Sequence, residues 1–133
     1  SNVGTTTLCA FLMNTGTLTS TVGGITINGS TTSTGAEPGV VAFSTSTTVP
    51  IISAGGLSIT ATGTTQTTIA SLGASTITNT TGNISVTANE TAGGGNTGIN
   101  SSGAITQNAN GGSIYYCYKK RKITKKNIGI HDC

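Results

Sequence analysis

Short segments in which apolar and polar residues alternate recur along the chain, each directly after a glycine-containing turn. Four such segments have their first apolar residue at Ile25, Leu57, Ile84 and Ile114, at intervals of 32, 27 and 30 residues. Alternation with period two, carried by β-branched residues, is typical of β-strands with one buried face. The repeats contain no stretch with apolar residues at helical spacing. The pattern therefore predicts one strand of this kind in every unit of about 30 residues.

Two further apolar blocks precede that strand in each unit. The block that comes first in the unit varies more from copy to copy. Its copies are Leu8–Leu12, Gly39–Phe43, Ile69–Leu72 and Gly98–Ile99. The second block covers residues 16–19, 49–52, 73–78 and 103–106, and its copy at 49–52 is the least similar to the others. Polar runs such as 31–35 and 92–96 are rich in Gly, Thr and Ser and are expected to be loops. The pattern thus predicts three short strands in each unit.

Three short strands cannot bury their apolar side alone, whereas stacked units bury it against one another. Parallel strands of successive units lie about 4.8 Å apart, so equivalent Ile, Leu and Val side chains would form continuous columns. We therefore predict that residues 1–116 form an all-β, parallel β-solenoid (β-helix) of about four coils, with about 30 residues per coil. A β-sandwich is the structural alternative, although it usually has turns every 8–12 residues and no longer period.

The composition agrees with this fold and points away from catalysis. Thr, Ser, Asn and Gly make up 74 of the 133 residues, and 7% are charged, compared with about 25% in ordinary soluble domains. Thr suits the outer positions of strands, and Gly and Asn suit sharp corners. Residues 1–114 contain only two charged side chains, Glu37 and Glu90. We therefore expect no enzyme, no metal site and no cofactor.

Basic residues are concentrated near the C-terminus, where the composition changes most sharply. They are Lys119, Lys120, Arg121, Lys122, Lys125 and Lys126. The change divides the chain into a repeat region, 1–116, and a basic C-terminal tail or cap, 117–133. The six residues are candidates for contact with an anionic surface, because basic clusters bind phosphates. A solvated tail, or a cap that blocks end-to-end stacking, is the simpler interpretation, and we do not expect nucleic acid as a partner.

The three cysteines give neither a disulfide framework nor a metal motif. Cys9 lies in an apolar run and is expected to be a small buried residue. Cys117 and Cys133 flank the basic tail, where they either form a disulfide in an oxidising compartment or stay as thiols. No stretch approaches the ~20 apolar residues that span a bilayer, so we expect no membrane anchor in this chain.

Other candidate sites are weaker. Catalysis by His131 and Cys133, with Asp132 beside them, would depend on a chain terminus, which is usually mobile. Glu37 and Glu90 are 53 residues apart and would lie nearly two coils from each other. Five Asn-X-Ser/Thr sequences are candidate glycosylation sites, close to the number that this composition gives by chance: Asn28, Asn79, Asn83, Asn89 and Asn100.

Pairs of threonines separated by one residue recur at 17/19, 45/47, 60/62 and 76/78. Flat arrays of Thr on β-solenoids suit ice binding, provided that the pairs align on one face. These pairs fall in different blocks of the unit, which argues against regular alignment.

The blocks Gly82-Asn-Ile-Ser-Val-Thr and Ser102-Gly-Ala-Ile-Thr, with their long Thr/Asn/Gly connections, resemble repeats of large exported bacterial adhesins. The nearest family is the filamentous haemagglutinin-like proteins secreted by the two-partner route, followed by autotransporter passengers. The resemblance covers about residues 14–114, without the N-terminal secretion-domain signature of the family. It implies a right-handed β-helical stalk that a Gram-negative cell exports and uses in attachment or aggregation.

We therefore expect an extracellular, cell-surface module that is structural or adhesive and forms part of a stalk or fibre. Its expected partners are host or environmental glycans and surfaces, or further copies of itself. The alternatives are a self-assembling filament subunit or a phage tail-fibre segment and, with less support, a polysaccharide-acting β-helix enzyme or an ice-binding protein. Enzymes of that kind gather acids and bases on one face, and this chain has too few.

Overall fold

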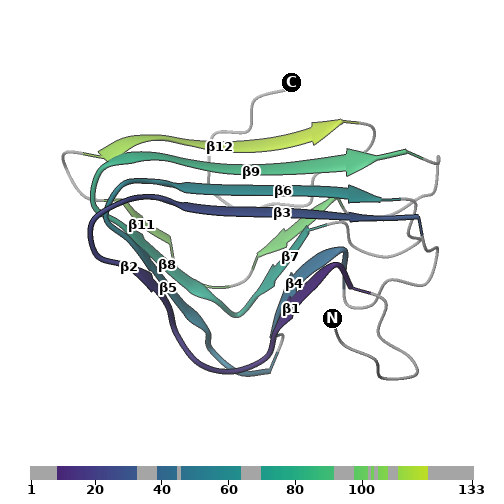
Figure 1. The fold of residues 1–133 in the computed structure, drawn as a ribbon, viewed down its shortest axis with the longest axis horizontal. Coiled ribbons are helices and arrows are strands. Elements are labelled where there is room, and N and C mark those ends of the chain that lie inside the picture. Colours follow the sequence, from purple (N-terminus) through teal and green to yellow (C-terminus); the bar gives the residue numbers. More distant parts are fainter. Residues whose placement is uncertain are drawn as a thin grey trace.

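The strands of this protein form three sheets in which every pairing is parallel (Figure 1). The computed structural model describes residues 9–32, 39–44, 46–63, 70–91, 98–101, 103, 105–107 and 111–119. These residues contain twelve strands and no helix. The all-β, parallel architecture predicted from the sequence is confirmed. The alternative of a β-sandwich is wrong, because a sandwich is built from antiparallel strands.

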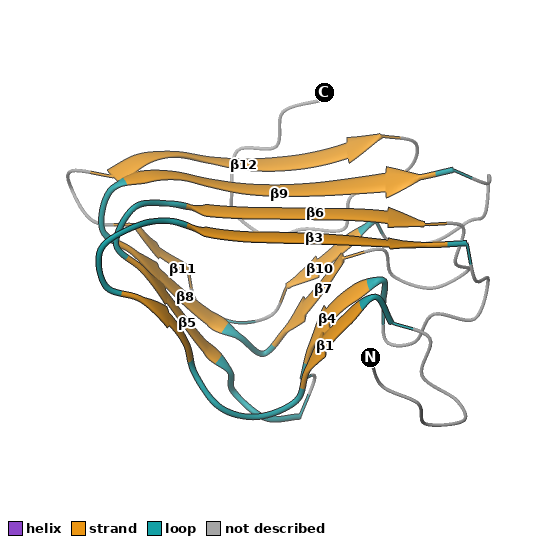
Figure 2. Cartoon of the chain, in the orientation of Figure 1, coloured by secondary structure: helices purple, strands orange, loops and turns teal. Residues whose placement is uncertain are grey.

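Each sheet takes one strand from every unit. The first sheet is β1 (Phe11–Met13), β4 (Val41–Phe43), β7 (Ala70–Gly73) and β10 (Ile99–Ser101). The second sheet is β2 (Leu18–Ser20), β5 (Pro50–Ser53), β8 (Thr76–Asn79) and β11 (Ile105–Gln107). The long sheet is β3 (Ile25–Thr31), β6 (Leu57–Gly63), β9 (Gly82–Glu90) and β12 (Gly111–Lys119). In Figure 2 the long sheet crosses the top of the view, and the other two sheets converge below it.

The register of the long sheet confirms the repeat seen in the sequence. Ile25 pairs with Leu57, Leu57 pairs with Ile84, and Ile84 pairs with Ile114. The pairing of β3 with β6 runs without interruption from Ile25 to Thr31. Equivalent apolar residues of successive units therefore lie side by side in adjacent strands, as a stack of repeats requires.

The two shorter sheets follow the same order of units. The second sheet aligns the apolar residues of the second block, including the divergent copy: Leu18, Ile51, Ile77 and Ile105. The first sheet aligns those of the first block: Phe11, Val41, Ala70 and Ile99. The connections from the long sheet to the next strand of the first sheet, 33–38, 64–69 and 92–97, lie outside the described residues.

Alternation divides each long strand into an inner and an outer set of side chains. In β6 the inner residues Leu57, Ile59 and Ala61 are buried, whereas the outer residues between them are half-buried. Inner residues of all three sheets form one hydrophobic core. Burying an aliphatic side chain contributes about 1.5–3 kcal/mol before the entropic cost of ordering it. The core thus holds the three sheets together.

The turns from the second sheet into the long sheet share a hydrogen bond. Ser20 donates from Oγ to the carbonyl of Gly23 at 2.8 Å, and Ser53 donates in the same way to the carbonyl of Gly56. The side chain at the end of the short strand thereby satisfies a carbonyl three residues further on. Gly56 has a φ of 111°, a conformation that residues with a side chain rarely adopt, which explains why a glycine stands at this corner.

Asn79 makes the equivalent turn in the third unit and also binds the second unit. It is in register with Ser53 and fully buried. Its Nδ2 donates to the carbonyls of Thr81 and Gly82 at 2.9 and 3.0 Å. Its Oδ1 accepts a hydrogen bond from the backbone nitrogen of Gly56 at 3.0 Å. One amide therefore closes its own corner and connects it to the preceding corner.

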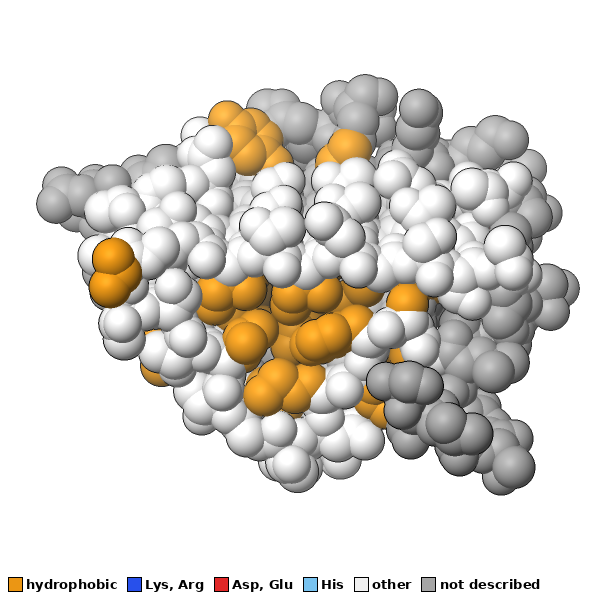
Figure 3. Space-filling model, viewed as in Figure 1, with side chains coloured by type: hydrophobic (Ala, Val, Ile, Leu, Met, Phe, Trp, Pro, Cys, Tyr) orange, Lys and Arg blue, Asp and Glu red, His pale blue; other side chains and the backbone are white. Residues whose placement is uncertain are grey.

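The two ends of the stack differ in how far their apolar residues are covered. At the N-terminal end, Phe11, Met13, Leu18 and Ile25 are only partly buried. Apolar side chains gather in the hollow between the sheets in Figure 3. At the C-terminal end, Tyr116 of β12 is 1% exposed, whereas Ile114 of the same strand is partly buried. Both ends of the stack present edge strands, which are β1, β2 and β3 at one end and β10, β11 and β12 at the other. At the N-terminal end, each of the three edge strands also carries a partly buried apolar residue.

β12 continues past the boundary placed between residues 116 and 117. Residues 117–119 pair with residues 87–89 of β9, so the sheet architecture extends to Lys119. The rest of the tail, 120–133, lies outside the described residues. Cys9 also differs from expectation, because it is half-buried rather than buried. It lies just before β1, in the less covered first unit.

Candidate functional site: the outer face of the long sheet

The outer face of the long sheet displays small polar side chains in three columns. Alternation turns these side chains away from the core, and the register places one from each unit in every column. The columns are Thr26-Ser58-Ser85, Asn28-Thr60-Thr87 and Ser30-Thr62-Asn89. None of these nine side chains is charged. Because like charges would repel at the spacing between strands, such columns stack without an electrostatic penalty.

β12 extends two of these columns with larger groups. Tyr115 is in register with Ser85 and is 39% exposed, so the first column ends in an accessible aromatic ring. Cys117 is in register with Thr87 and is disulfide-bonded. Cys133, the partner suggested by the sequence, lies outside the described residues.

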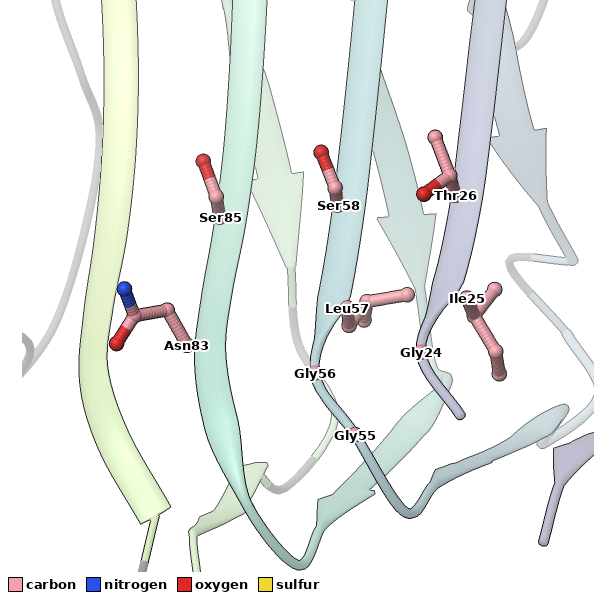
Figure 4. A pocket seen from close by; sticks show the side chains of 9 residues that line it. All are labelled: Gly24, Ile25, Thr26, Gly55, Gly56, Leu57, Ser58, Asn83 and Ser85. Carbon is pink, nitrogen blue, oxygen red and sulfur yellow. The ribbon is translucent and has the colours of Figure 1, made fainter. Parts of the chain in front are cut away.

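A shallow depression of about 220 Å³ lies beside the first column, where the strands of the long sheet begin (Figure 4). Gly24 and Gly56 directly precede β3 and β6 and provide no side chain to fill this space. A Cβ at Gly24 would come within 3.1 Å of the carbonyl oxygen of Gly56, so the backbones here approach closely. Pockets that enclose a drug-sized molecule usually measure about 300–1,000 Å³. The depression therefore suits part of an extended ligand lying on the surface.

Polar side chains border the depression. Figure 4 shows Thr26, Ser58 and Ser85 in a row across β3, β6 and β9, with Asn83 on β9. Within the described part of the chain, the three hydroxyls of the row form no hydrogen bond with another protein group. Each is available to donate one hydrogen bond and to accept others. Asn83 accepts a hydrogen bond from the backbone nitrogen of Ser113 at 2.9 Å, which leaves its amide nitrogen to donate elsewhere.

The chemistry of this face is hydrogen bonding without charge. Hydroxyls and an amide match ligands that also carry both donors and acceptors, and an exposed tyrosine ring can pack against an apolar ligand face. The nine column residues include no carboxylate, imidazole or amine, so they offer no general acid or base. The arrangement is suited to binding.

The candidate catalytic residues are placed elsewhere or not described. Glu90 ends β9, is in register with Gly63 and is buried. Glu37, His131, Asp132 and Cys133 lie outside the described residues. In the ranges that the structure covers, no group of three His, Cys, Asp or Glu side chains could hold a metal ion. The same ranges hold no helix long and apolar enough to cross a membrane.

The candidate glycosylation asparagines have different environments. Asn28 and Asn83 are exposed. Asn89 is half-buried, and its Nδ2 donates to Oγ1 of Thr62 at 3.3 Å. Asn79 is fully buried with its amide hydrogen-bonded, so the folded chain leaves no room there for a glycan. The side chain of Asn100 lies outside the described residues.

The Thr-X-Thr pairs lie on more than one sheet. Thr60 and Thr62 are on the long sheet, whereas Thr76 and Thr78 are on the second sheet. Ile52 lies between the outer residues of β2 and β8 in the second sheet and is 41% exposed. The threonines therefore do not form one continuous array over the described strands. The pair at 45/47 is only partly described.

One of the six candidate basic residues lies on a described strand. Lys119 is the last residue of β12, and only its backbone position is described. The other five lie outside the described residues.

The two adjacent tyrosines of β12 lie on opposite faces of the long sheet. Tyr115 belongs to the outer face, whereas Tyr116 is in register with the core residue Val86 and is buried. Burial raises the pKa of the Tyr116 phenol above its ordinary value, and the polar side chain of Ser101 offsets part of that rise. The alternation Ile114-Tyr115-Tyr116 was the signal that distinguishes the two rings.

No family model matches the chain, and neither a curated protein nor a solved structure is detectably similar to it. The resemblance to filamentous haemagglutinin-like repeats therefore stays a prediction. The features that bear on the function of the protein are therefore the geometry and chemistry of its outer face.

Proposed function

We propose that the chain is a structural and adhesive module of a surface-exposed stalk or fibre outside the cell. The observation that supports this most is the continuous register of Ile25, Leu57, Ile84 and Ile114 in the long sheet. Units that contact only their neighbours can be added in a line, which gives an elongated and extendable body. Such a body repeats the same outer columns along its length, and repeated sites raise the avidity of weak contacts.

The finer architecture of this proposal is a right-handed parallel β-solenoid of about four coils. Each unit contributes strands in the order first sheet, second sheet and long sheet. The spacing of about 30 residues accommodates three short strands and their turns. Right-handedness is the expected sense, because crossover connections between parallel strands are right-handed in almost all cases.

The proposal assigns the chain no catalytic activity. Its support is the chemistry of the outer face, where the columns hold hydroxyls and amides. Polysaccharide hydrolysis would require two carboxylates flanking the scissile bond, and the buried Glu90 is the only carboxylate with a described side chain.

Attachment of coated particles tests the adhesive function. Microspheres carrying the full chain through an N-terminal tag should be retained under flow on a layer of bacterial or eukaryotic cells, while albumin-coated microspheres are washed away. Retention equal to the albumin control on every surface would contradict the proposal. Release of new reducing ends from a polysaccharide would instead indicate an enzyme.

The N-terminal end of the stack favours self-assembly as a second candidate function. Its partly buried residues Phe11, Leu18 and Ile25 are in register with core residues of the next unit, so a further unit placed there would bury them. Free strand edges also pair readily with other strands. A copy of this chain stacked on that end would continue both the core and the sheets.

A charged substitution at the N-terminal end of the stack tests self-assembly. Sedimentation velocity of the full chain should show association that increases with concentration. Ile25→Lys should abolish this association, because stacking would bury an unpaired charge. Thr60→Lys, on the outer face, is the matched control and should leave it unchanged. A chain that stays monomeric at all concentrations would rule out assembly through this end.

A further inference from the structure

We propose that the depression at the start of the long sheet, together with the first outer column, binds neutral polysaccharide chains. This inference rests on the adhesive function proposed above and assigns to it a ligand class and a contact surface. The site consists of the row Thr26-Ser58-Ser85, the amide of Asn83 and the ring of Tyr115. The ligand chain would lie along the column and cross the strands of the long sheet.

The polar groups of the site match sugar hydroxyls. Thr26, Ser58 and Ser85 present three hydroxyls, and none of them forms a hydrogen bond with a protein group in the described residues. A sugar hydroxyl both donates and accepts, so it can bond to each of these groups without an unpaired donor or acceptor. Asn83 is held by its hydrogen bond from Ser113 and can donate from Nδ2 into the same row. The site therefore offers several weak bonds in a line.

The shape of the site fits an extended ligand. Because Gly24 and Gly56 have no side chains, a ligand in the depression can approach the backbone closely at these two residues. From β3 to β12 the first column spans three strand spacings, or about 14 Å. The exposed Tyr115 ring stands at the far end of that span. Aromatic side chains with a polar tip pack against amphipathic partners, and the C–H face of a sugar ring is one of these.

The uncharged site should distinguish neutral polysaccharides from anionic ones. The side chains that form the site carry no formal charge, so a polyanion gains no ion pair by binding there. Binding of a neutral glycan should therefore change little between about 0.15 M and about 1 M salt, whereas contacts between charges weaken as salt rises. Any attraction between a polyanion and the basic residues among 119–126 would instead weaken as the salt concentration rises.

Direct binding measurements on the full chain test the site. The probes are three neutral polysaccharides, laminarin, dextran and galactomannan, and the polyanion alginate as the charged comparison. We expect at least one neutral probe to bind at both salt concentrations, more tightly than alginate at high salt. Failure of all three neutral probes to bind would overturn the inference, as would alginate binding more tightly than every neutral probe at high salt.

A pair of triple variants locates the binding surface. Thr26→Ala/Ser58→Ala/Ser85→Ala removes the hydroxyls of the first column and should weaken binding about tenfold or more. Asn28→Ala/Thr60→Ala/Thr87→Ala removes the second column from the same three strands and should change affinity by less than about twofold. Tyr115→Ala should weaken binding roughly threefold to tenfold. Circular dichroism and thermal unfolding confirm that the two triple variants are equally folded.

Equal affinities of the two triple variants would overturn the assignment of the site. Particle retention distinguishes that failure from failure of the adhesive function. If particles coated with the first-column variant adhere as well as wild type, the site is wrong and the adhesive function stands. If the chain binds a neutral glycan through the first column but its particles do not adhere, the site stands and the adhesive function fails.

Discussion

The first sheet and the long sheet are stacked in the same way, but they differ in how far the residues on their outer side are buried. In the long sheet, β6 alternates between buried and half-buried residues. In the first sheet, β4 and β7 are buried along their whole length. Ala42 is fully buried although it lies outside the hydrophobic core cluster, and Ser71, its neighbour in register, is 1% exposed. The long sheet therefore has a solvent-facing side, whereas the two central strands of the first sheet, β4 and β7, are covered on both sides.

This difference separates stability from recognition. Outer residues of the long sheet can change with little effect on folding, because water already solvates them. The corresponding residues of the first sheet cannot, because any polar group placed there must find a partner without water. Substitutions at equivalent positions of the two sheets test how sharp this division is.

The largest expected effect comes from placing a carboxylate on each outer side. Ser71→Glu in the first sheet should lower the free energy of unfolding by about 3–5 kcal/mol, because it buries an unpaired charge. Thr60→Glu in the long sheet should change it by less than about 0.5 kcal/mol. Urea denaturation of both variants measures the difference. If both variants lost the same stability, the first sheet would be as open to solvent as the long sheet.

A smaller effect is expected at the corners that lead into the long sheet. Asn79→Ala should cost about 2–3 kcal/mol, because it leaves the buried backbone nitrogen of Gly56 without its acceptor. Ser20→Ala, at the solvent-exposed corner of the first unit, should cost about 1 kcal/mol or less. Chemical denaturation of the two variants gives both values. A loss at Ser20 as large as that at Asn79 would mean that burial does not set the strength of these corners.

The buried face of β12 should respond to alkaline pH through Tyr116. Because burial raises the pKa of Tyr116 in the folded state, the unfolded state releases this proton first as the pH rises. The stability associated with Tyr116 is therefore fully present below the ordinary tyrosine pKa of about 10 and is lost above it. Tyr116→Phe should reduce the fall in melting temperature above about pH 10 relative to wild type. A pH profile of Tyr116→Phe identical to that of wild type would contradict the burial of Tyr116.

The smallest effect is expected at a buried serine between the first and second sheets. Ser75 is fully buried, and among the described residues its Oγ has no hydrogen-bond partner. Ser75→Ala should therefore leave stability unchanged or raise it by up to about 1 kcal/mol. Ser53→Ala is the control, since this hydroxyl donates to Gly56, and it should cost about 1–2 kcal/mol. A loss at Ser75 similar to that at Ser53 would show that its hydroxyl is satisfied.

Sequence patterns predicted the parallel stack because the signal repeats. Alternation marked Ile25, Leu57 and Ile84 as equivalent, and the structure pairs them. The strands of the first sheet were found only as short apolar runs, because residues buried on both faces do not alternate. Their two-sided burial could not be predicted, since it depends on what packs against the second face rather than on the strand itself.

The candidate site was less visible in the sequence than the fold. The outer threonines were expected on strands, but the columns became apparent only once the register was known. Asn79 matched a glycosylation sequence, and its buried role at a corner was missed because its partners include Gly56, 23 residues away. A polar residue followed three positions later by glycine, as in Ser20 and Gly23, is the local pattern that would have indicated it.

The burial of Asn79 has a practical consequence for producing the protein. Asn79-Thr-Thr is an acceptor for the oligosaccharide that eukaryotic secretory cells attach to nascent chains. Sugar added there before folding would have to enter the interior and displace the amide from the carbonyls of Thr81 and Gly82. Expression in bacteria that lack this modification avoids the conflict, whereas secretion from yeast or mammalian cells would yield misfolded material.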